Sequence, residues 1–285
     1  MLFTLPQNTK KMCNILVLYL LTQMIIVLFT KFFMITVQNL TKKYSADSVA
    51  LDNISFNINK GEICGYIGTN GAGKSTTVKI LTGVLGFDSG KVLLNDIDVS
   101  KDPFEIKKIV GYVPENANLF NSLSPREYID FIGTIRNIEK SVLAKRLDNF
   151  SELFEFKDLL DESIGNISKG NKQKVLITSA LIHNPDFIFF DEPLNGLDAN
   201  SIFVFQDLVS FLVSKHKTIL YCSHILNTIE KISTQIILLD KGRIVIDSKT
   251  EDLKRSENYT DLENVFRNLN PEQESGNISY ENLFD

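Results

Sequence analysis

A glycine-rich segment, GTNGAGKST at residues 68–76, lies between an apolar run at 62–68 and a run with helical spacing at 74–85. Glycine lets backbone N–H groups turn inward around phosphate oxygens, because it has no Cβ to block the approach. The pattern from Gly68 to Ser75 matches G-x-x-x-x-G-K-[ST], with the strand before it and the helix after it that give this motif its meaning. A chance match somewhere in 285 residues has a probability of about 1%. The sequence therefore predicts a phosphate-binding loop in an α/β fold.

The residue types in this loop indicate its ligand. The helix that follows contributes the positive end of its dipole. Lys74 is placed to reach the β- and γ-phosphates of a nucleotide, and the Ser75 hydroxyl to reach Mg²⁺. The loop residues that we expect to contact the nucleotide are Gly68, Asn70, Gly71, Gly73, Lys74, Ser75 and Thr76.

A second motif, FIFFDE at residues 187–192, joins four apolar residues to two carboxylates. A hydrophobic strand that ends in aspartate places that carboxylate at the edge of the sheet where open α/β sheets bind ligands. Asp191 is suited to hold Mg²⁺ through water, and Glu192 to accept a proton from an attacking water. Many strands end in acidic turns, so this motif is weak alone. Paired with the phosphate loop, it predicts a catalytic site that includes Lys74 and Glu192.

Composition limits the other classes of function. Hydrophobic residues make up 44% and charged residues 23% of the chain, as in an average globular protein. The net charge is −5, and no dense run of lysine or arginine occurs, which argues against a nucleic acid partner. The three cysteines form no CxxC pair, and three histidines are too few for a histidine-rich metal site. We therefore expect a cytosolic protein with reduced thiols.

Strand-like and helix-like stretches alternate from Met34 onward, which predicts an α/β core. A block at about 116–165 has helical spacing instead, and within it Ser124 begins a capping-box pattern. We expect this block to be an inserted helical subdomain. Strands are expected at 35–39 (followed by a polar turn at 41–43), 50–58, 62–68, 91–94, 187–191, 218–223, 235–239 and 243–247, and helices at 74–85, 171–183, 201–215 and up to 232.

The two ends of the chain depart from this pattern. Residues 13–30 are almost wholly apolar, with lysines on both sides and Gln23 near the centre. Their length is marginal for a membrane span, which needs about 20 residues. Two interpretations stay open: a membrane anchor, or a non-native extension of a chain that begins at Met34. Beyond about 250 the sequence is polar and weakly patterned. The expected regions are 1–33, a main domain at 34–253 and a short tail at 254–285.

Together these motifs resemble the nucleotide-binding domain of ATP-binding cassette (ABC) transporters, over about 34–253. The resemblance implies ATP and Mg²⁺ as ligands. It also implies a P-loop NTPase core, which is a mainly parallel sheet flanked by helices, with an antiparallel β subdomain and an inserted helical subdomain. The sequence ISKGN at 167–171 is similar to the signature motif of the family in a Ser-Lys-Gly form. In that motif Ser168 and Gly170 would donate hydrogen bonds to an anion from the start of a helix.

Four further positions gain roles from the resemblance. His224 resembles the switch histidine that contacts the γ-phosphate, and we place it in the catalytic set. Asp198 resembles a residue of the dimer-contact loop, and Tyr44 the aromatic ring that stacks on adenine. Glu115 stands where the family usually has glutamine. Its carboxylate is a suitable Mg²⁺ ligand, but when ionised it donates no hydrogen bond to the attacking water.

The resemblance also implies partners. Two cassettes would face each other head to tail, as a homodimer or heterodimer, with two ATP molecules between the phosphate loop of one and the signature motif of the other. A separate membrane-spanning permease subunit would hold the pair at the cytoplasmic face of the membrane. Three features favour export: the Ser-Lys-Gly form of the signature motif, the sequence Pro114-Glu115 and the short C-terminal region.

Two alternative functions stay open. One is a cassette ATPase without a transport role, acting in DNA repair or translation. Only 100 positions separate Gly68 from Ser168 (168 − 68), which leaves no room for the long coiled-coil insertion common in such relatives. The other is a regulatory nucleotide binder without catalysis, against which the intact Lys74, Asp191 and Glu192 argue.

Overall fold

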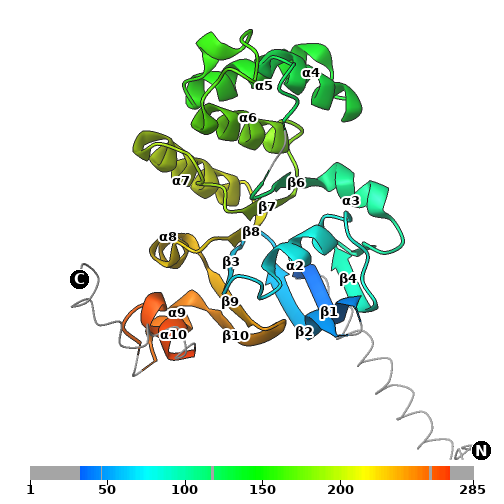
Figure 1. Ribbon diagram of the computed structural model, residues 1–285, viewed down its shortest axis with the longest axis vertical. Coiled ribbons are helices and arrows are strands. Elements are labelled where there is room, and N and C mark those ends of the chain that lie inside the picture. Colours follow the sequence, from blue (N-terminus) through cyan, green and yellow to red (C-terminus); the bar gives the residue numbers. More distant parts are fainter. Residues whose placement is uncertain (1–32, 46, 117–118, 257–258, 270–285) are drawn as a thin grey trace, which may run out of the picture.

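The computed structural model describes residues 33–45, 47–116, 119–256 and 259–269, which form two sheets with helices packed around them (Figure 1). The apolar stretch at 13–30 and the end of the tail at 271–285 lie outside the described residues. Within the described part of the chain, no helix combines the length and the apolar character needed to cross a membrane.

The larger sheet carries the strands that precede the predicted ligand motifs. Its six strands have the order β10-β9-β3-β8-β7-β6. The strands from β9 to β6 are parallel, and β10 pairs antiparallel with β9. The bounds are Ile63–Gly68 (β3), Val110–Val113 (β6), Phe187–Asp191 (β7), Thr218–Cys222 (β8), Gln235–Asp240 (β9) and Arg243–Lys249 (β10).

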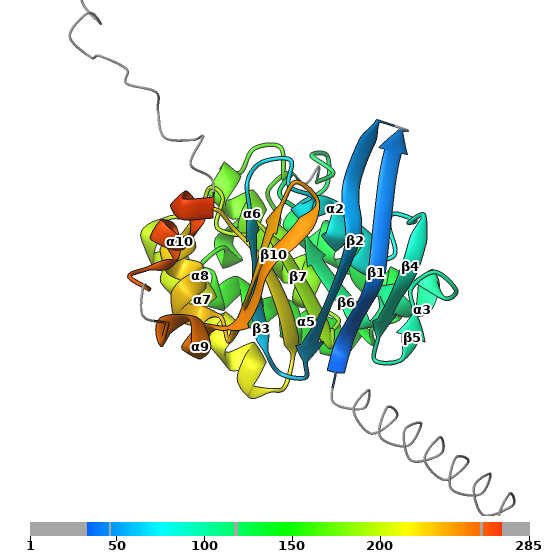
Figure 2. The ribbon, with the colours of Figure 1, turned by 90° about the horizontal axis from the view of Figure 1, so that it is seen from below.

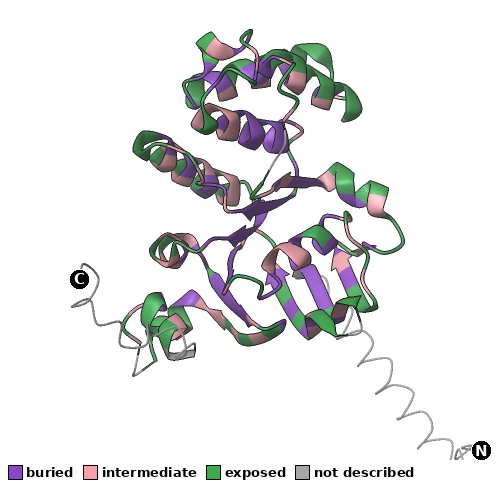
Figure 3. Ribbon diagram, viewed as in Figure 1, coloured by how far each residue is buried: buried purple, intermediate pink, exposed green. Residues whose placement is uncertain are grey.

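Successive residues of a strand point to opposite faces of the sheet, and here they belong to two separate cores. Ile188 and Phe190 pack into one core, whereas Phe187 and Phe189 pack into the other. All four side chains are fully buried, and Figure 3 shows buried residues along the parallel strands of this sheet. Burial on both faces explains why these strands are continuous apolar runs in the sequence.

The smaller sheet is antiparallel, in the order β2-β1-β4-β5, and Figure 2 shows β1 and β2 side by side as a long hairpin. The predicted turn at 41–43 is wrong, because β1 continues through these residues. Asn39 has φ 50°, and the pairing with β2 shifts between Val37 and Leu40. This bulge keeps Leu40 fully buried. The bounds are Phe33–Ser45 (β1), Ser48–Asn59 (β2), Ser89–Leu94 (β4) and Ile97–Asp98 (β5).

The helices between β3 and β9 pack on the sheets or form a separate group around α4 and α5 (Figure 1). The predicted capping box at the start of α4 is confirmed: Ser124 N donates to Glu127 Oε2 (2.8 Å) and Glu127 N donates to Ser124 Oγ (3.2 Å). The bounds are Lys74–Leu81 (α2), Pro103–Ile109 (α3), Pro125–Ile135 (α4), Lys140–Leu153 (α5), Lys157–Leu159 (η1, a 3₁₀ turn), Lys169–Leu181 (α6), Ala199–Ser214 (α7) and Leu226–Ile232 (α8).

The region after 250 is more ordered than the sequence indicated. It contains α9 (Thr250–Lys254) and α10 (Leu262–Leu269). Leu262 is buried against the same core as Phe190, and its N–H donates to Glu230 Oε2 of α8 at 3.1 Å. The interpretation of this region as weakly patterned is therefore wrong for α10, in which Leu262, Val265, Phe266 and Leu269 have the i, i+3, i+4, i+7 spacing of a helix. Helix α9 is only five residues long, too short for periodicity to indicate it.

Candidate functional site

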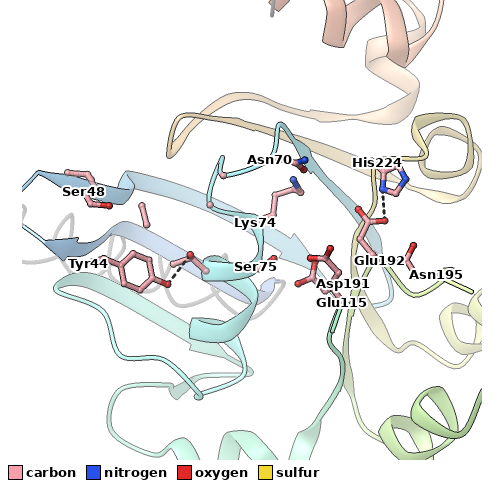
Figure 4. A pocket seen from close by; sticks show the side chains of 15 residues that line it. Tyr44, Ser48, Asn70, Lys74, Ser75, Glu115, Asp191, Glu192, Asn195 and His224 are labelled. Atoms are coloured by element: carbon pink, nitrogen blue, oxygen red, sulfur yellow. Dashed lines mark hydrogen bonds and ion pairs between the residues drawn. The ribbon is translucent and has the colours of Figure 1, made fainter. Parts of the chain in front are cut away.

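A pocket of about 840 Å³ lies where the phosphate loop meets the carboxyl ends of β6, β7 and β8 (Figure 4). It gathers predicted residues from five separate places in the sequence. The lining residues are Tyr44, Ser48, Val49, Ala50, Asn70, Gly71, Gly73, Lys74, Ser75, Thr76, Glu115, Asp191, Glu192, Asn195 and His224.

The backbone of the phosphate loop requires glycine at two positions. Gly73 has φ 111°, and a Cβ there would lie 2.6 Å from the carbonyl oxygen of Ala50. A Cβ on Gly68 would lie 2.3 Å from the carbonyl oxygen of Leu239. Gly73 lets the loop turn into α2, and Gly68 lets β3 pass close to β9. Gly68 itself does not line the pocket.

Lys74 is the first residue of α2, and its ammonium group reaches back across the loop. Its Nζ donates to the carbonyl oxygens of Gly68 (2.8 Å) and Thr69 (3.0 Å). The cation therefore lies among the loop residues beside the start of the helix, where an anion is favoured by both the charge and the helix dipole.

Asp191 ends β7 and is 3% exposed. Burial raises its pKa above the ordinary value, and a hydrogen bond with the Ser75 side chain acts in the opposite direction. The nearby carboxylates Glu115 and Glu192 raise the pKa of Asp191 further, because they disfavour another negative charge. A divalent cation would relieve this repulsion.

The donor set fits Mg²⁺. Ser75, Glu115 and Asp191 present only oxygen atoms, which are the ligands that this hard cation prefers. Among the described residues, no group of three or more Asp, Glu, His or Cys side chains is placed to hold a metal alone. Mg²⁺ in nucleotide sites is commonly held by one or two carboxylates together with substrate phosphates and water, so these residues suit a metal that arrives with a nucleotide.

Glu192 follows Asp191 in a left-handed conformation, with φ 52°, and its N–H donates to the carbonyl oxygen of Cys222 at 3.0 Å. Two groups from the end of β8 contact one oxygen of its carboxylate. Ser223 Oγ donates to Glu192 Oε2 at 3.1 Å, and His224 Nδ1 lies 3.0 Å from the same atom. The Glu192 side chain is 12% exposed, whereas that of His224 is 71% exposed.

Tyr44 comes from the end of β1 and lies at the opposite side of the pocket (Figure 4). Its hydroxyl is 3.2 Å from Thr76 Oγ1, while the residue as a whole is 59% exposed. The ring is thus attached to α2 at its hydroxyl end and open to a stacking partner.

Besides Gly68, three predicted contacts lie outside the pocket. Ser168 caps the start of α6, where its Oγ accepts from Asn171 N at 3.2 Å. A Cβ on Gly170 would lie 2.6 Å from the carbonyl oxygen of Gly196, so the signature turn packs against the loop that contains Asp198. The side chain of Asp198 caps α7 by accepting from the N–H and hydroxyl of Ser201, and these hydrogen bonds lower its pKa to about 2.

Several site residues were missed by the sequence analysis. Ser48, Val49 and Ala50 line the pocket from β2, and no motif points to them. Asn195 also lines it, and Ser223 contacts Glu192 from behind. The adjacency of Asn195 to the FIFFDE motif and of Ser223 to His224 was the only available signal.

Known proteins share both the sequence and the fold. The family model described as ABC transporter matches residues 51–195. The chain is 32% identical over 218 residues to the ABC transporter ATP-binding protein NatA of Bacillus subtilis (strain 168), covering 76% of this chain and 89% of that protein. It is 30% identical over 219 residues to the linearmycin resistance ATP-binding protein LnrL of the same organism, covering 76% of this chain and 70% of that protein. The chain belongs to the ABC transporter family.

Solved structures of ABC proteins agree with the fold. The structure described as an ATP-binding subunit of an ABC transporter superposes with a TM-score of 0.78 at 27% identity, covering 83% of this chain and 99% of that one. The ATP-binding cassette MJ0796, described as a dimeric post-hydrolysis state bound to ADP and Pi, gives a TM-score of 0.70 at 26% identity, covering 76% and 99%. The predicted fold class is confirmed, and this ABC protein is the ATP-binding subunit of a transporter, from a family whose ATP-binding domains are ATPases.

Proposed function

We propose that this ABC subunit hydrolyses MgATP in the pocket around Lys74 and, working as one of a pair, drives export through a separate membrane-spanning permease. The observation that carries the proposal is the convergence of Lys74, Asp191, Glu192 and His224 on one pocket. Phosphoryl transfer to water requires four parts: a phosphate cradle, a metal-binding carboxylate, a proton acceptor and a group able to contact the γ-phosphate.

The residues divide the work of hydrolysis. Lys74 exchanges its two loop carbonyls for oxygens of the β- and γ-phosphates, which the loop amides also hold. Ser75, Asp191 and Glu115 would hold Mg²⁺, which when bound neutralises charge on the phosphates. Glu192 accepts the proton of the attacking water, and His224, exposed at the mouth of the pocket, contacts the γ-phosphate.

Pairing of two cassettes would complete the site. Ser168, Gly170 and Asp198 do not line the pocket that contains Lys74, and they lie together at the starts of α6 and α7. In a head-to-tail pair, the signature turn of one subunit reaches the nucleotide of the other. The dimeric cassette MJ0796 supports this arrangement. Binding of two nucleotides then favours the closed pair, and hydrolysis reopens it.

An exposed aromatic group supports docking on a permease. Phe120 and Phe131 are 56% and 47% exposed, their rings are 6.1 Å apart, and Ile135 beside them on α4 is 59% exposed. These residues follow Glu115, so movement at the nucleotide can reach them. An amphipathic helix of a membrane protein, at the cytoplasmic face, fits such a surface. Export is favoured because LnrL, a relative, is named for resistance to linearmycin.

The test uses the tagged full-length chain purified from membranes in mild detergent. We expect Mg²⁺-dependent ATP hydrolysis and a co-purifying polytopic membrane protein, whose recovery falls when Phe131 is replaced by Ser. Gly86→Ala is the control, since Gly86 lies in open space away from this surface. Absence of hydrolysis would refute the catalytic assignment. Recovery of ribosomes or DNA in place of a membrane protein would favour the non-transport alternative.

A further inference from the structure

We infer that Ser223 is a positioning residue for hydrolysis: its hydroxyl fixes one carboxylate oxygen of Glu192, so that the other faces the attacking water. This inference rests on the proposed function, in which Glu192 is the proton acceptor. In the balanced step, the water oxygen bonds to the γ-phosphorus as the bond to the bridging oxygen breaks. One water proton passes to Glu192, and the bridging oxygen leaves with its electron pair on ADP.

The surroundings of the Ser223 hydroxyl group determine which atom receives its proton in a hydrogen bond. Ser223 directly follows β8 and is 2% exposed. Ile225 N donates to Ser223 Oγ at 3.1 Å, and a backbone N–H acts only as a donor. The hydroxyl oxygen is therefore the acceptor in that contact, and the hydroxyl proton is available for Glu192 Oε2, 3.1 Å away.

The two carboxylate oxygens of Glu192 have different surroundings. Oε2 contacts both Ser223 Oγ and His224 Nδ1. Over the described ranges of the chain, no hydrogen bond to Glu192 Oε1 is found. The lone pairs of Oε1 are thus free to take a proton, while Oε2 is held. A hydrogen bond to an ionised carboxylate is stronger than one between neutral groups, so the hydroxyl of Ser223 restrains the Glu192 side chain at Oε2.

The Ser223 side chain is held against Glu192 more firmly than the His224 side chain. The His224 side chain is 71% exposed and must serve the γ-phosphate when nucleotide is bound. Ser223 is buried at the end of a sheet strand, and the bond from Glu192 N to Cys222 O joins the ends of β7 and β8 beside it. A side chain on a rigid element positions a reacting group better than a mobile one. Ser223 therefore holds Glu192 whether or not His224 has turned away.

The first test compares Ser223→Ala with Ser223→Thr, in the full-length chain, under saturating MgATP. Loss of a hydrogen bond to a charged reacting group should lower kcat of Ser223→Ala about tenfold to a hundredfold, with KM for ATP changed less than twofold. Ser223→Thr keeps the hydroxyl and should restore kcat to within about threefold of wild type. Ser223→Cys, close in size but a weak donor, keeps the comparison valid if the alanine variant unfolds, and it should lose activity like the alanine variant.

The second test asks whether Ser223 acts through Glu192. In a double-mutant cycle, single-turnover rates over long incubation should be equal for Glu192→Gln and for the double variant with Ser223→Ala. Any of three results would overturn the inference: a lower single-turnover rate in the double variant than in Glu192→Gln, a wild-type kcat in Ser223→Ala, or a kcat in Ser223→Thr as low as that of Ser223→Ala. If instead Glu192→Gln alone hydrolyses ATP at the wild-type rate, the proposed role of Glu192 is wrong, and the inference about Ser223 is wrong with it. This result differs from the three above, so the two failures can be told apart.

Discussion

Lys74 Nζ lies 2.8 Å from the carbonyl oxygen of Gly68, six residues earlier in the same loop. With its second bond, to the carbonyl oxygen of Thr69 at 3.0 Å, the lysine holds the loop in the curved form that a phosphate requires. The cation that we propose to bind the nucleotide thus also shapes the loop around it.

Lys74→Ala should therefore affect both binding and the loop itself. We expect ATP affinity to fall at least about tenfold, because a charge-assisted hydrogen bond to phosphate is lost, and the unliganded loop to become more mobile. Calorimetric ATP titration and hydrogen exchange of the loop amides would measure the two effects. Lys79→Ala is the matched control: Lys79 is exposed on the same helix and should change neither quantity.

Glu192→Gln should separate binding from catalysis. Glutamine keeps the size of the side chain but takes up no proton at neutral pH, so hydrolysis should fall about 10²- to 10⁴-fold while ATP affinity stays within about threefold of wild type. The trapped ATP should leave a long-lived closed pair. Phosphate release and light scattering with ATP would check this, and wild-type turnover in the variant would show that another group is the base.

The central site was predictable because its residues lie in short motifs of fixed spacing. The phosphate loop and the FIFFDE strand each carry their own structural context, and parallel strands bring Lys74 and Asp191 to the same edge of the sheet. Strands β3, β7, β8 and β9 of the larger sheet were also found, since burial of both faces produces unbroken apolar runs such as the one in β7. The hairpin partner β10 was predicted as well, but the four-residue edge strand β6 was not.

The remaining features depend on contacts between distant segments. Ser48 reaches the pocket only because β2 folds back along β1, and no local pattern records that pairing. The turn predicted at 41–43 failed because the bulge at Asn39 is set by the need to bury Leu40. Helix α10 is different, because the helical spacing of Leu262, Val265, Phe266 and Leu269 was present in the sequence and was overlooked. Only its packing on α8 depends on a distant segment.

Gly73→Ala should destabilise the protein and impair ATP binding together. The added Cβ would meet the Ala50 carbonyl at 2.6 Å in a backbone with φ 111°, which costs about 1–3 kcal/mol of folding stability if the loop does not shift. Urea unfolding and ATP titration would measure both losses. Gly86→Ala is the control: nothing lies within 4 Å of its added Cβ, so its stability should stay within about 0.5 kcal/mol of wild type or rise.

His183 should make the protein sensitive to mild acid. Its Nε2 lies 3.0 Å from the carbonyl oxygen of Val110, and burial followed by the charge of Arg136 lowers its pKa from 6.5 to about 4. The unfolded chain therefore takes up a proton at higher pH than the folded one. The free energy of unfolding therefore keeps its full value above pH 6.5 and decreases as the pH falls toward about 4. The decrease due to His183 is roughly 1–3 kcal/mol after allowance for partial exposure.

His183→Gln should flatten that pH dependence, since glutamine does not titrate. Urea midpoints measured between pH 7 and pH 4 would show a smaller decline than in wild type. His216→Asn is the control: His216 is exposed at φ 60°, a conformation that asparagine tolerates. Equal slopes for wild type and His183→Gln would contradict the assignment.

Leu262→Ala tests whether α10 supports the segment that carries His224. Leu262 is 1% exposed in the core shared with β7, and its N–H is bonded to Glu230 of α8, the helix that begins two residues after His224. Removal of a buried leucine side chain should cost about 2–4 kcal/mol, and the amides of α8 should exchange faster than those of α6. The exposed Arg267→Ala on the same helix should leave both unchanged. A stability loss without faster exchange in α8 would mean that α10 stabilises the core but does not restrain the helix that follows His224.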